Sequence, residues 1–264
     1  LTVAGFEPTT GFADPNATLY GFVAAAAAGG ARILTDTEAT AILTDGGRVT
    51  GVATAGGTIA TRTVVLAGGA FADRLLGPLG VDLGLKPRRA RVAVFRWPAE
   101  MDQRRRHRVV IDSTQHSWFR PEGKAGTLIG VEHGERDRVD PDATPESIEQ
   151  EYIERARAAL AARFPDFAHA TMRGGWSGVF MQSPDDHPII DRLPQVEGLY
   201  LMAGDSGTSF KTSPAIGVCL AEWITEGRAK LVDLTPFRST RFAEGKPWVD
   251  ELAYADEIEQ TISR

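Results

Sequence analysis

The residues best suited to chemistry lie in a stretch of small side chains, Gly204–Lys211 (GDSGTSFK). The apolar run Leu199–Met202 precedes it and predicts a buried strand. Ser213 and Pro214 follow it and predict a helix with Ser213 as its N-cap and Pro214 as its first residue. Small residues between a strand and a helix N-terminus leave backbone N–H groups open to a flat or anionic ligand. Because Lys211 adds a cation at the mouth of this loop, we predict a ligand cradle that can also hold a carboxylate.

A second loop of small residues, Gly68-Gly69-Ala70, directly follows the short apolar run Val64–Ala67. The run predicts a strand buried on both faces, and Phe71–Leu76 predicts the helix that follows the loop. Glycines at the end of a strand let a ligand approach the backbone closely. Taken alone, such a loop is more often a plain turn between a strand and a helix.

Hydrophobic periodicity and turn residues predict the elements that position these loops. Asp14 and Pro15 predict the N-cap and first residue of a helix that runs to Ala28, and its alanines would let it pack closely on a sheet. Pairs of Asp and Gly, which favour tight turns, separate short β-rich runs in the next segment. The strands predicted there are Ala31–Leu34, Ala39–Leu43, Val49–Thr54 and Thr58–Thr61.

The middle of the chain changes to longer strands with polar alternation, which predict a largely antiparallel sheet, and to one amphipathic helix over 145–164. These strands are Ala90–Trp97, Arg108–Asp112, Ser117–Arg120, Thr127–Val131 and Met172–Met181. The predicted fold is therefore α/β, of mixed α+β character. We expect residues 1–85 and 183–230 to form one lobe, residues 86–182 a second lobe inserted in it, and residues 231–264 a C-terminal tail on the surface.

Composition excludes several classes of function. The 264 residues are 42% hydrophobic, with a net charge of −6 that argues against nucleic-acid binding. The single cysteine, Cys219, rules out an internal disulfide framework, and none of the histidines has metal-ligand spacing. No apolar run reaches the length of about 20 residues that a membrane span needs. We therefore expect a cytoplasmic protein that binds no nucleic acid, membrane or metal.

Four segments in the same order resemble the FAD-dependent D-amino-acid oxidase superfamily, on the branch of sarcosine oxidase and dimethylglycine dehydrogenase. They are GFADPNATLYGF (Gly11–Phe22), VVLAGGAFADRLL (Val64–Leu76), SPDDHPIIDRLPQVEGLYLMAGDSG (Ser183–Gly207) and TSFKTSPAIG (Thr208–Gly217). The resemblance implies an FAD-binding lobe and a substrate lobe. It also implies oxidation of the C–N bond of an amino acid or N-methyl amino acid, of the sarcosine, dimethylglycine or D-amino-acid type.

The resemblance also assigns residues to the site. Lys211 corresponds to the lysine that pairs with the substrate carboxylate, and His187 either orders the active site or makes a structural hydrogen bond. Gly178 stands where monomeric sarcosine oxidases attach FAD through a cysteine, so FAD is expected to bind non-covalently. Asp205 would oppose negative charge on the flavin, so we expect it to point away or to pair with a cation. The expected cofactor contacts are Ala39, Gly68, Gly69, Ala70, Gly204, Ser206, Gly207, Thr208, Ser209, Phe210 and Lys211.

One part of the family pattern is absent from the sequence, which contains no G-x-G-x-x-G fingerprint for the FAD pyrophosphate. The resemblance therefore implies that a partner chain or an N-terminal segment carries the fingerprint. A second hypothesis is a truncated, non-catalytic relative that acts as a binding or partner subunit. A third is an oxidoreductase of a non-amine substrate, such as a polyol phosphate, although Lys211 favours a substrate with a carboxylate.

Overall fold

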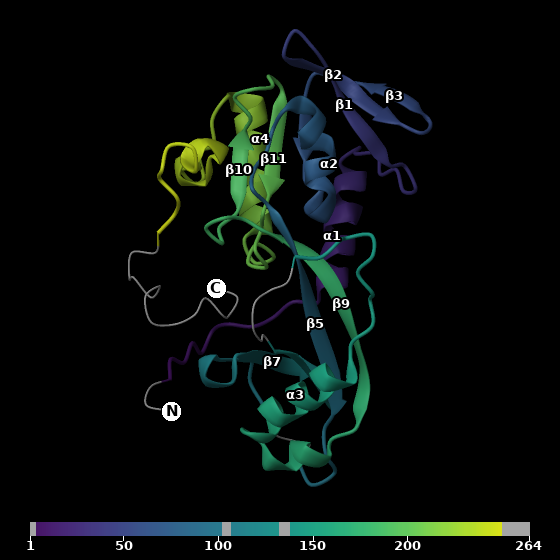
Figure 1. The fold of residues 1–264 in the computed structure, drawn as a ribbon, viewed down its shortest axis with the longest axis vertical. Helices are drawn as coiled ribbons and strands as arrows, with labels where there is room; N and C mark the ends of the chain where they lie inside the picture. The colour runs from purple at the N-terminus through teal and green to yellow at the C-terminus, as the bar shows by residue number, and fades with distance from the viewer. Residues whose placement is uncertain (1–3, 102–106, 132–137, 250–264) are drawn as a thin grey trace.

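The computed structural model describes residues 4–101, 107–131 and 138–249. Two groups of elements lie at opposite ends of the molecule, and the long strands β5 (Lys86–Arg96) and β9 (Met172–Gln182) extend from their junction into the lower group (Figure 1). As predicted, the fold is mixed α/β, with antiparallel strands in each sheet and one parallel strand pair.

The upper group contains two three-stranded sheets. The first is an antiparallel meander of β1, β2 and β3, whose first turn is made by Gly46 and Gly47 with φ of +55° and +78°. In the second sheet, β11 pairs antiparallel with β10 and parallel with β4. Their bounds are Ala39–Asp45 (β1), Arg48–Thr54 (β2), Gly57–Ala60 (β3), Val64–Leu66 (β4), Ile189–Arg192 (β10) and Leu199–Ala203 (β11).

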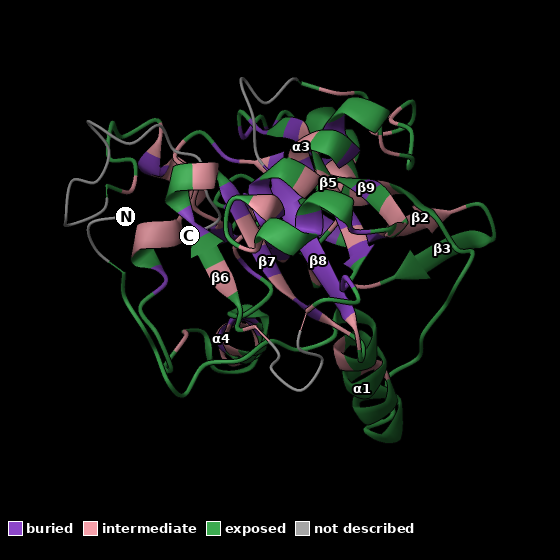
Figure 2. Ribbon diagram, turned by 90° about the horizontal axis from the view of Figure 1, so that it is seen from below, coloured by how far each residue is buried: buried purple, intermediate pink, exposed green. Residues whose placement is uncertain are grey.

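The lower group is a five-stranded antiparallel sheet in the order β6-β7-β8-β5-β9, with helix α3 (Gln150–Ala161) packed against it. The remaining strands are β6 (Val110–Asp112), β7 (Ser117–Glu122) and β8 (Gly126–Val131). All six residues of β8 are buried, and Figure 2 shows this strand behind α3. The predicted strands lie within a few residues of β5 to β9. The helix predicted over 145–164 is shorter than expected, because it begins at Gln150, after Glu149 as N-cap, and ends at Ala161.

In the mixed sheet of β10, β11 and β4, strand β11 is packed on both faces, since successive strand residues point to opposite sides. The prediction that the run Val64–Ala67 is buried on both faces is wrong, because β4 is an edge strand among the described residues and Val65 is 44% exposed. Leu199 and Leu201 of β11 face a core shared with Leu76 of α2 (Ala72–Leu76). Tyr200 faces a second core built on α4 (Ser213–Glu226) and on residues that follow it. The loop that follows β11 is therefore positioned by packed residues on both faces of that strand.

Helix α1 (Pro15–Ala28) begins as predicted, with the Asp14 carboxylate accepting a hydrogen bond of 2.8 Å from Ala17 N–H. The prediction that it packs on a sheet is wrong, because none of its residues is buried. Tyr20 is 69% exposed and Phe22 is 52% exposed. The alanines would allow close packing, but no sheet of the described residues covers this helix, which projects from the molecule in Figure 2.

Two other local predictions are corrected. Residues 31–34 form no strand, because an extended segment needs a hydrogen-bonded neighbour and none of the described strands pairs with it. The N-cap of α4 is Thr212, and Ser213 is the first helical residue, its hydroxyl donating to the Phe210 carbonyl at 2.9 Å. Among the described residues, no helix has the length and apolarity to cross a membrane.

Candidate functional site

The two small-residue loops lie at the same edge of the parallel strand pair. β11 and β4 run in the same direction, with Leu201 beside Leu66, so the chain leaves both strands at their carboxyl ends. Gly68-Gly69-Ala70 follows β4 and Gly204–Ser209 follows β11. In open α/β sheets this is the edge at which ligands bind. The fold thus brings together two segments that are far apart in the sequence.

Glycines shape both loops, but for different reasons. Gly204 has φ of +61°, and a Cβ there would lie 2.8 Å from the Leu85 side chain, so a larger residue would be strained and would require its neighbours to shift. Gly69 and Gly207 have φ of +52° and +78°, and a Cβ on either would meet no atom within 4 Å. Their backbones are therefore open to close approach by a ligand. Ser206, directly before Gly207, adopts φ of +52°, a conformation that a side chain makes unfavourable.

A pocket of about 310 Å³ lies beside the β11–α4 loop. Lys211, Thr208 and Ser209 reach it from the loop, and His187 reaches it from the turn after β9. The fold therefore places both residues of predicted catalytic role on one pocket wall. The rest of the lining is mostly apolar and includes Pro188, Ile190, Ala215, Ile216, Cys219, Val232, Leu234 and Phe237.

The orientation of His187 is fixed by its neighbours. Its Nδ1 lies 2.7 Å from the Asp185 carbonyl oxygen, and its ring stacks on Trp248 with 5.2 Å between centroids. Because a carbonyl oxygen only accepts, Nδ1 carries a proton in this contact. This geometry is the structural hydrogen bond that the sequence analysis gave as one of two roles for His187.

The turn that holds His187 is tied to a buried ion pair that sequence reasoning missed. Arg241 is fully buried and binds both carboxylate oxygens of Asp185 at 2.8 Å. Trp248 N–H donates to the same carboxylate at 2.8 Å. Burial alone would raise the pKa of Asp185, but these hydrogen bonds outweigh it and hold the pKa below its ordinary value. The expectation of a tail lying on the surface is therefore wrong at Arg241, where the chain enters the interior.

The same turn contacts the β11–α4 loop. Ser183 N–H donates to Ser206 Oγ at 3.1 Å, and the Ser183 hydroxyl donates to the His187 carbonyl at 2.7 Å. Ser206 N–H donates to the Met181 carbonyl at 2.9 Å. Both serines are buried, so these bonds fix the left-handed backbone at Ser206. Ser209 is also buried, and its hydroxyl has no hydrogen-bond partner among the described residues.

Of the two arrangements expected for Asp205, pairing with a cation is not seen among the described residues, and pointing away from the flavin stays a prediction. No salt bridge to Asp205 is found among the described residues, and burial raises the pKa of its carboxyl. A carboxyl whose neutral form is favoured opposes negative charge on a nearby ligand less than an ionised one does. The predicted conflict with an anionic ligand is thereby reduced.

Other predicted contact residues lie away from this pocket. Ala39 is exposed at the start of β1, in the separate meander, and Phe210 is 50% exposed at the loop surface. Gly68 packs against α2, since a Cβ there would lie 3.2 Å from Ala72 Cα. Their roles as cofactor contacts stay predictions.

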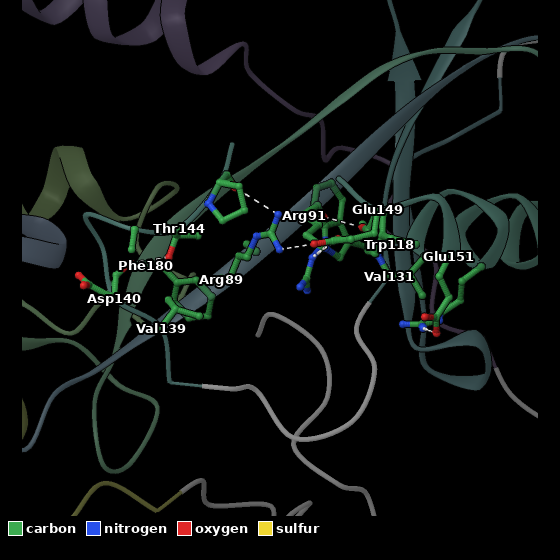
Figure 3. Close-up of a pocket in the computed structure, with 16 residues that line it drawn as sticks. Arg89, Arg91, Trp118, Val131, Val139, Asp140, Thr144, Glu149, Glu151 and Phe180 are labelled. Atoms are coloured by element: carbon green, nitrogen blue, oxygen red, sulfur yellow. Dashed lines mark hydrogen bonds and ion pairs between the residues drawn. The ribbon is translucent and has the colours of Figure 1, made fainter. Parts of the chain in front are cut away.

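A larger pocket, of about 710 Å³, lies on the five-stranded sheet next to the N-terminal end of α3 (Figure 3). Its cations are paired within the wall: Arg89 and Arg91 both bind Glu149. Trp118 lines this pocket and lies over Gly130, where a Cβ would be 2.5 Å from the indole. The two arginines thus share one carboxylate within the wall of this pocket.

Adjacent parallel strands that end in open glycine loops, with a helix behind one loop and an antiparallel sheet beyond, are typical of dinucleotide-binding oxidoreductases. Residues 1–223 match the family model described as FAD dependent oxidoreductase, and the chain belongs to this family. The predicted resemblance is therefore confirmed.

Individual relatives agree with this assignment. A glycine oxidase of Pseudomonas aeruginosa is 31% identical over 76% of this chain, and a sarcosine oxidase subunit beta of Rhodobacter capsulatus is 27% identical over 93%. The chain spans 52% and 56% of these relatives, about half their length. The crystal structure of L-proline dehydrogenase from P. horikoshii has the same fold, with a TM-score of 0.80, 24% identity, and coverage of 89% of this chain and 62% of that one.

Proposed function

We propose that this chain takes part in FAD-dependent oxidation of the C–N bond of an amino acid or N-methyl amino acid. The observation that carries the proposal is the shared edge of β4 and β11, from which two open glycine loops leave. The second of these loops also contributes Thr208, Ser209 and Lys211 to the pocket that contains His187. Family membership supports the redox class. Relatives named glycine oxidase and sarcosine oxidase support an amine that bears a carboxylate.

The residues present fit FAD. Gly69 and Gly207 leave their backbones open, and α4 begins directly behind the β11 loop, where its N-terminal partial positive charge favours an anion. FAD, when bound, supplies the acceptor for the hydride that leaves the substrate carbon. The sole cysteine, Cys219, is buried in α4, which supports non-covalent binding.

We assign binding and orientation of the substrate to the chain itself. Lys211 would hold the carboxylate by a charge-assisted hydrogen bond, and the apolar wall would cover the substrate side chain. His187, whose ring is oriented by the Asp185 carbonyl, would give the substrate a second polar contact in the same pocket. Holding the substrate at two points would orient it toward the loop edge, where bond breaking is faster for a fixed geometry.

We further propose that a partner chain or an N-terminal segment carries the missing pyrophosphate fingerprint. β4 is the last strand of its sheet among the described residues, and parallel strands are normally covered on both sides. The exposed apolar residues of α1 are a second surface suited to such a polypeptide. Several sarcosine oxidase relatives are named as subunit beta, which supports a partner chain as the source, whereas a monomeric sarcosine oxidase among the relatives supports an N-terminal segment.

The proposal is tested by the visible spectrum of the purified chain after addition of FAD and gel filtration. Retained flavin that bleaches anaerobically with sarcosine, dimethylglycine, glycine or a D-amino acid supports the proposed reaction. Retained flavin that bleaches only with a polyol substrate supports the alternative oxidoreductase. A folded chain that retains no flavin, alone or with a polypeptide carrying the fingerprint, contradicts the enzymatic proposal and leaves a non-catalytic relative.

The role of Lys211 is tested with Lys211→Met. Removal of a charge-assisted hydrogen bond lowers kcat/KM by about 10- to 100-fold, mainly through KM, because the carboxylate is bound equally in the ground state. Lys230→Met is the control, since Lys230 pairs with Glu226 on the surface. Equal kinetics in the two variants would contradict the assignment of Lys211.

A further inference from the structure

The segment that follows α4, here called the strap (residues 228–249), sends one charged side chain into the interior. Arg241 is 0% exposed, and Asp185, its partner, has a side chain that is 5% exposed. Burying two charges is costly unless every polar atom finds a partner. The hydrogen-bond partners of Arg241 therefore decide whether the burial of this pair is compensated.

All five N–H groups of the Arg241 guanidinium donate hydrogen bonds. Nε and one Nη2 hydrogen bind the two carboxylate oxygens of Asp185, and the other Nη2 hydrogen binds the His187 carbonyl at 2.9 Å. Nη1 binds the carbonyls of Phe237 and Arg238 at 2.9 and 3.1 Å. A planar five-donor group is the only side chain that can satisfy this geometry. Arg241 thus joins the strap to the turn over residues 183–187.

That turn is connected by hydrogen bonds to the loop that carries the open glycines. Ser183 takes part in both the turn and this connection. Its hydroxyl donates to the His187 carbonyl within the turn, and its N–H donates to Ser206 Oγ of the loop. Two backbone conformations with positive φ lie along this path, +60° at Asp186 and +52° at Ser206. Such conformations cost free energy and persist where their surroundings hold them. A chain of hydrogen bonds therefore connects Arg241 with the backbone of the β11–α4 loop.

We propose that Arg241 is a positioning residue, which fixes the β11–α4 loop through Asp185, Ser183 and Ser206 although it does not line the pocket. The strap also supplies Leu234 and Phe237 to the wall of the same pocket, so it shapes the site in two ways. The functional meaning of this order rests on the proposed FAD site. The order itself is a property of the chain and can be measured without FAD.

The test is hydrogen exchange at the amides of Ser206 and Thr208, which donate to the carbonyls of Met181 and Asp205 at 2.9 Å. Arg241→Lys keeps the charge but loses two of the five donors, so these amides should exchange about tenfold faster or more. Arg238→Lys is the matched control, because Arg238 lies on the same strap and binds Glu244 instead. It should leave both amides unchanged.

Coupling distinguishes positioning from a general loss of stability. Ser206→Ala removes the acceptor of the Ser183 N–H, so adding Arg241→Lys to it should accelerate Thr208 exchange by clearly less than the product of the two single effects. Uniform acceleration that includes β8, or additive effects of the two substitutions, would overturn the proposal. If Arg241→Lys fails to fold, Ser183→Ala interrupts the same path while leaving the ion pair in place, and unchanged exchange at Ser206 would overturn the proposal equally.

A final readout separates this proposal from the proposed function. Where the chain retains FAD, Arg241→Lys should raise the dissociation constant of FAD severalfold, and Arg238→Lys should not. A dissociation constant that does not change while the loop exchanges faster would overturn the link to the cofactor. Failure of the wild-type chain to bind FAD would contradict the proposed function, and the exchange results would still decide whether Arg241 positions the loop.

Discussion

The lower five-stranded sheet and the upper parallel pair differ in how fully the chain covers them. β8 is buried along its whole length between its neighbours and α3. In the upper group, by contrast, α1 buries none of its residues and β4 ends its sheet among the described strands. The lower group therefore has a complete core of its own. The upper group holds the open glycine loops and keeps apolar surface that another polypeptide can cover.

The largest expected effect tests whether the lower group is complete. Phe95 in β5 is 0% exposed and packs in the core under α3. Phe95→Ala should lower the free energy of unfolding by about 3–5 kcal/mol, because it removes buried apolar area and leaves a cavity. Urea unfolding followed by circular dichroism measures this loss. A loss of less than about 1 kcal/mol would mean that the sheet and α3 are loosely packed.

The next effect compares two glycines of the same loop. Gly204→Ala combines a positive φ with a 2.8 Å contact to Leu85, and should cost about 3 kcal/mol of unfolding free energy. Gly207→Ala has the positive φ alone and should cost about 1 kcal/mol. Because the Gly207 backbone is open, its alanine should weaken FAD retention more than it weakens stability. Equal retention in Gly207→Ala and wild type would contradict an approach of FAD at Gly207.

Local patterns explain which parts of the fold were predictable. The meander over 39–60 was predicted because turn glycines and alternating strands are adjacent in the sequence. The predicted packing of α1 was wrong because its composition describes a surface without saying what covers it. Periodicity therefore predicts a helix or strand well. It predicts how that element packs only where the element that covers it is adjacent in the sequence.

The site divides in the same way. The glycines of the β11 loop and Lys211 form a contiguous motif, so their resemblance to the family predicts a role for them from the order of residues alone. Arg241 lies in a tail without periodicity, 56 residues from Asp185 in the turn after β9, and no spacing rule joins the two. A single long-range ion pair becomes visible only when the chain is folded. The contribution of the strap was therefore beyond sequence reasoning.

Two carboxylates at the site should respond to pH with opposite signs. The pKa of Asp185 is lowered below its ordinary value of 3.8, so its stabilising effect is present above that value and is lost as pH falls through the folded pKa. The pKa of Asp205 is raised by burial, so its destabilising effect is present at neutral pH and is relieved as pH falls through the raised pKa.

Substitutions can separate these two contributions. Asp205→Asn should raise the free energy of unfolding at pH 7 and change it little in acid, where the wild-type carboxyl is already protonated. Asp185→Asn should lower the free energy of unfolding at pH 7 and flatten its decline toward acid. Urea unfolding at a series of pH values measures both. The same sign of change in the two variants at pH 7 would contradict the opposite pKa shifts.

The smallest expected change in the free energy of unfolding is at α1. A small change there would show that α1, unlike the lower sheet, is not part of a closed core. Tyr20 is 69% exposed, so Tyr20→Ala in the isolated chain should change the free energy of unfolding by no more than about 0.5 kcal/mol. If a partner chain covers α1, the same substitution should weaken its association strongly, since buried tyrosines carry much of the energy of an interface. A loss of about 2 kcal/mol or more in the isolated chain would instead place α1 within the core of this chain, and the upper region would then be as closed as the lower.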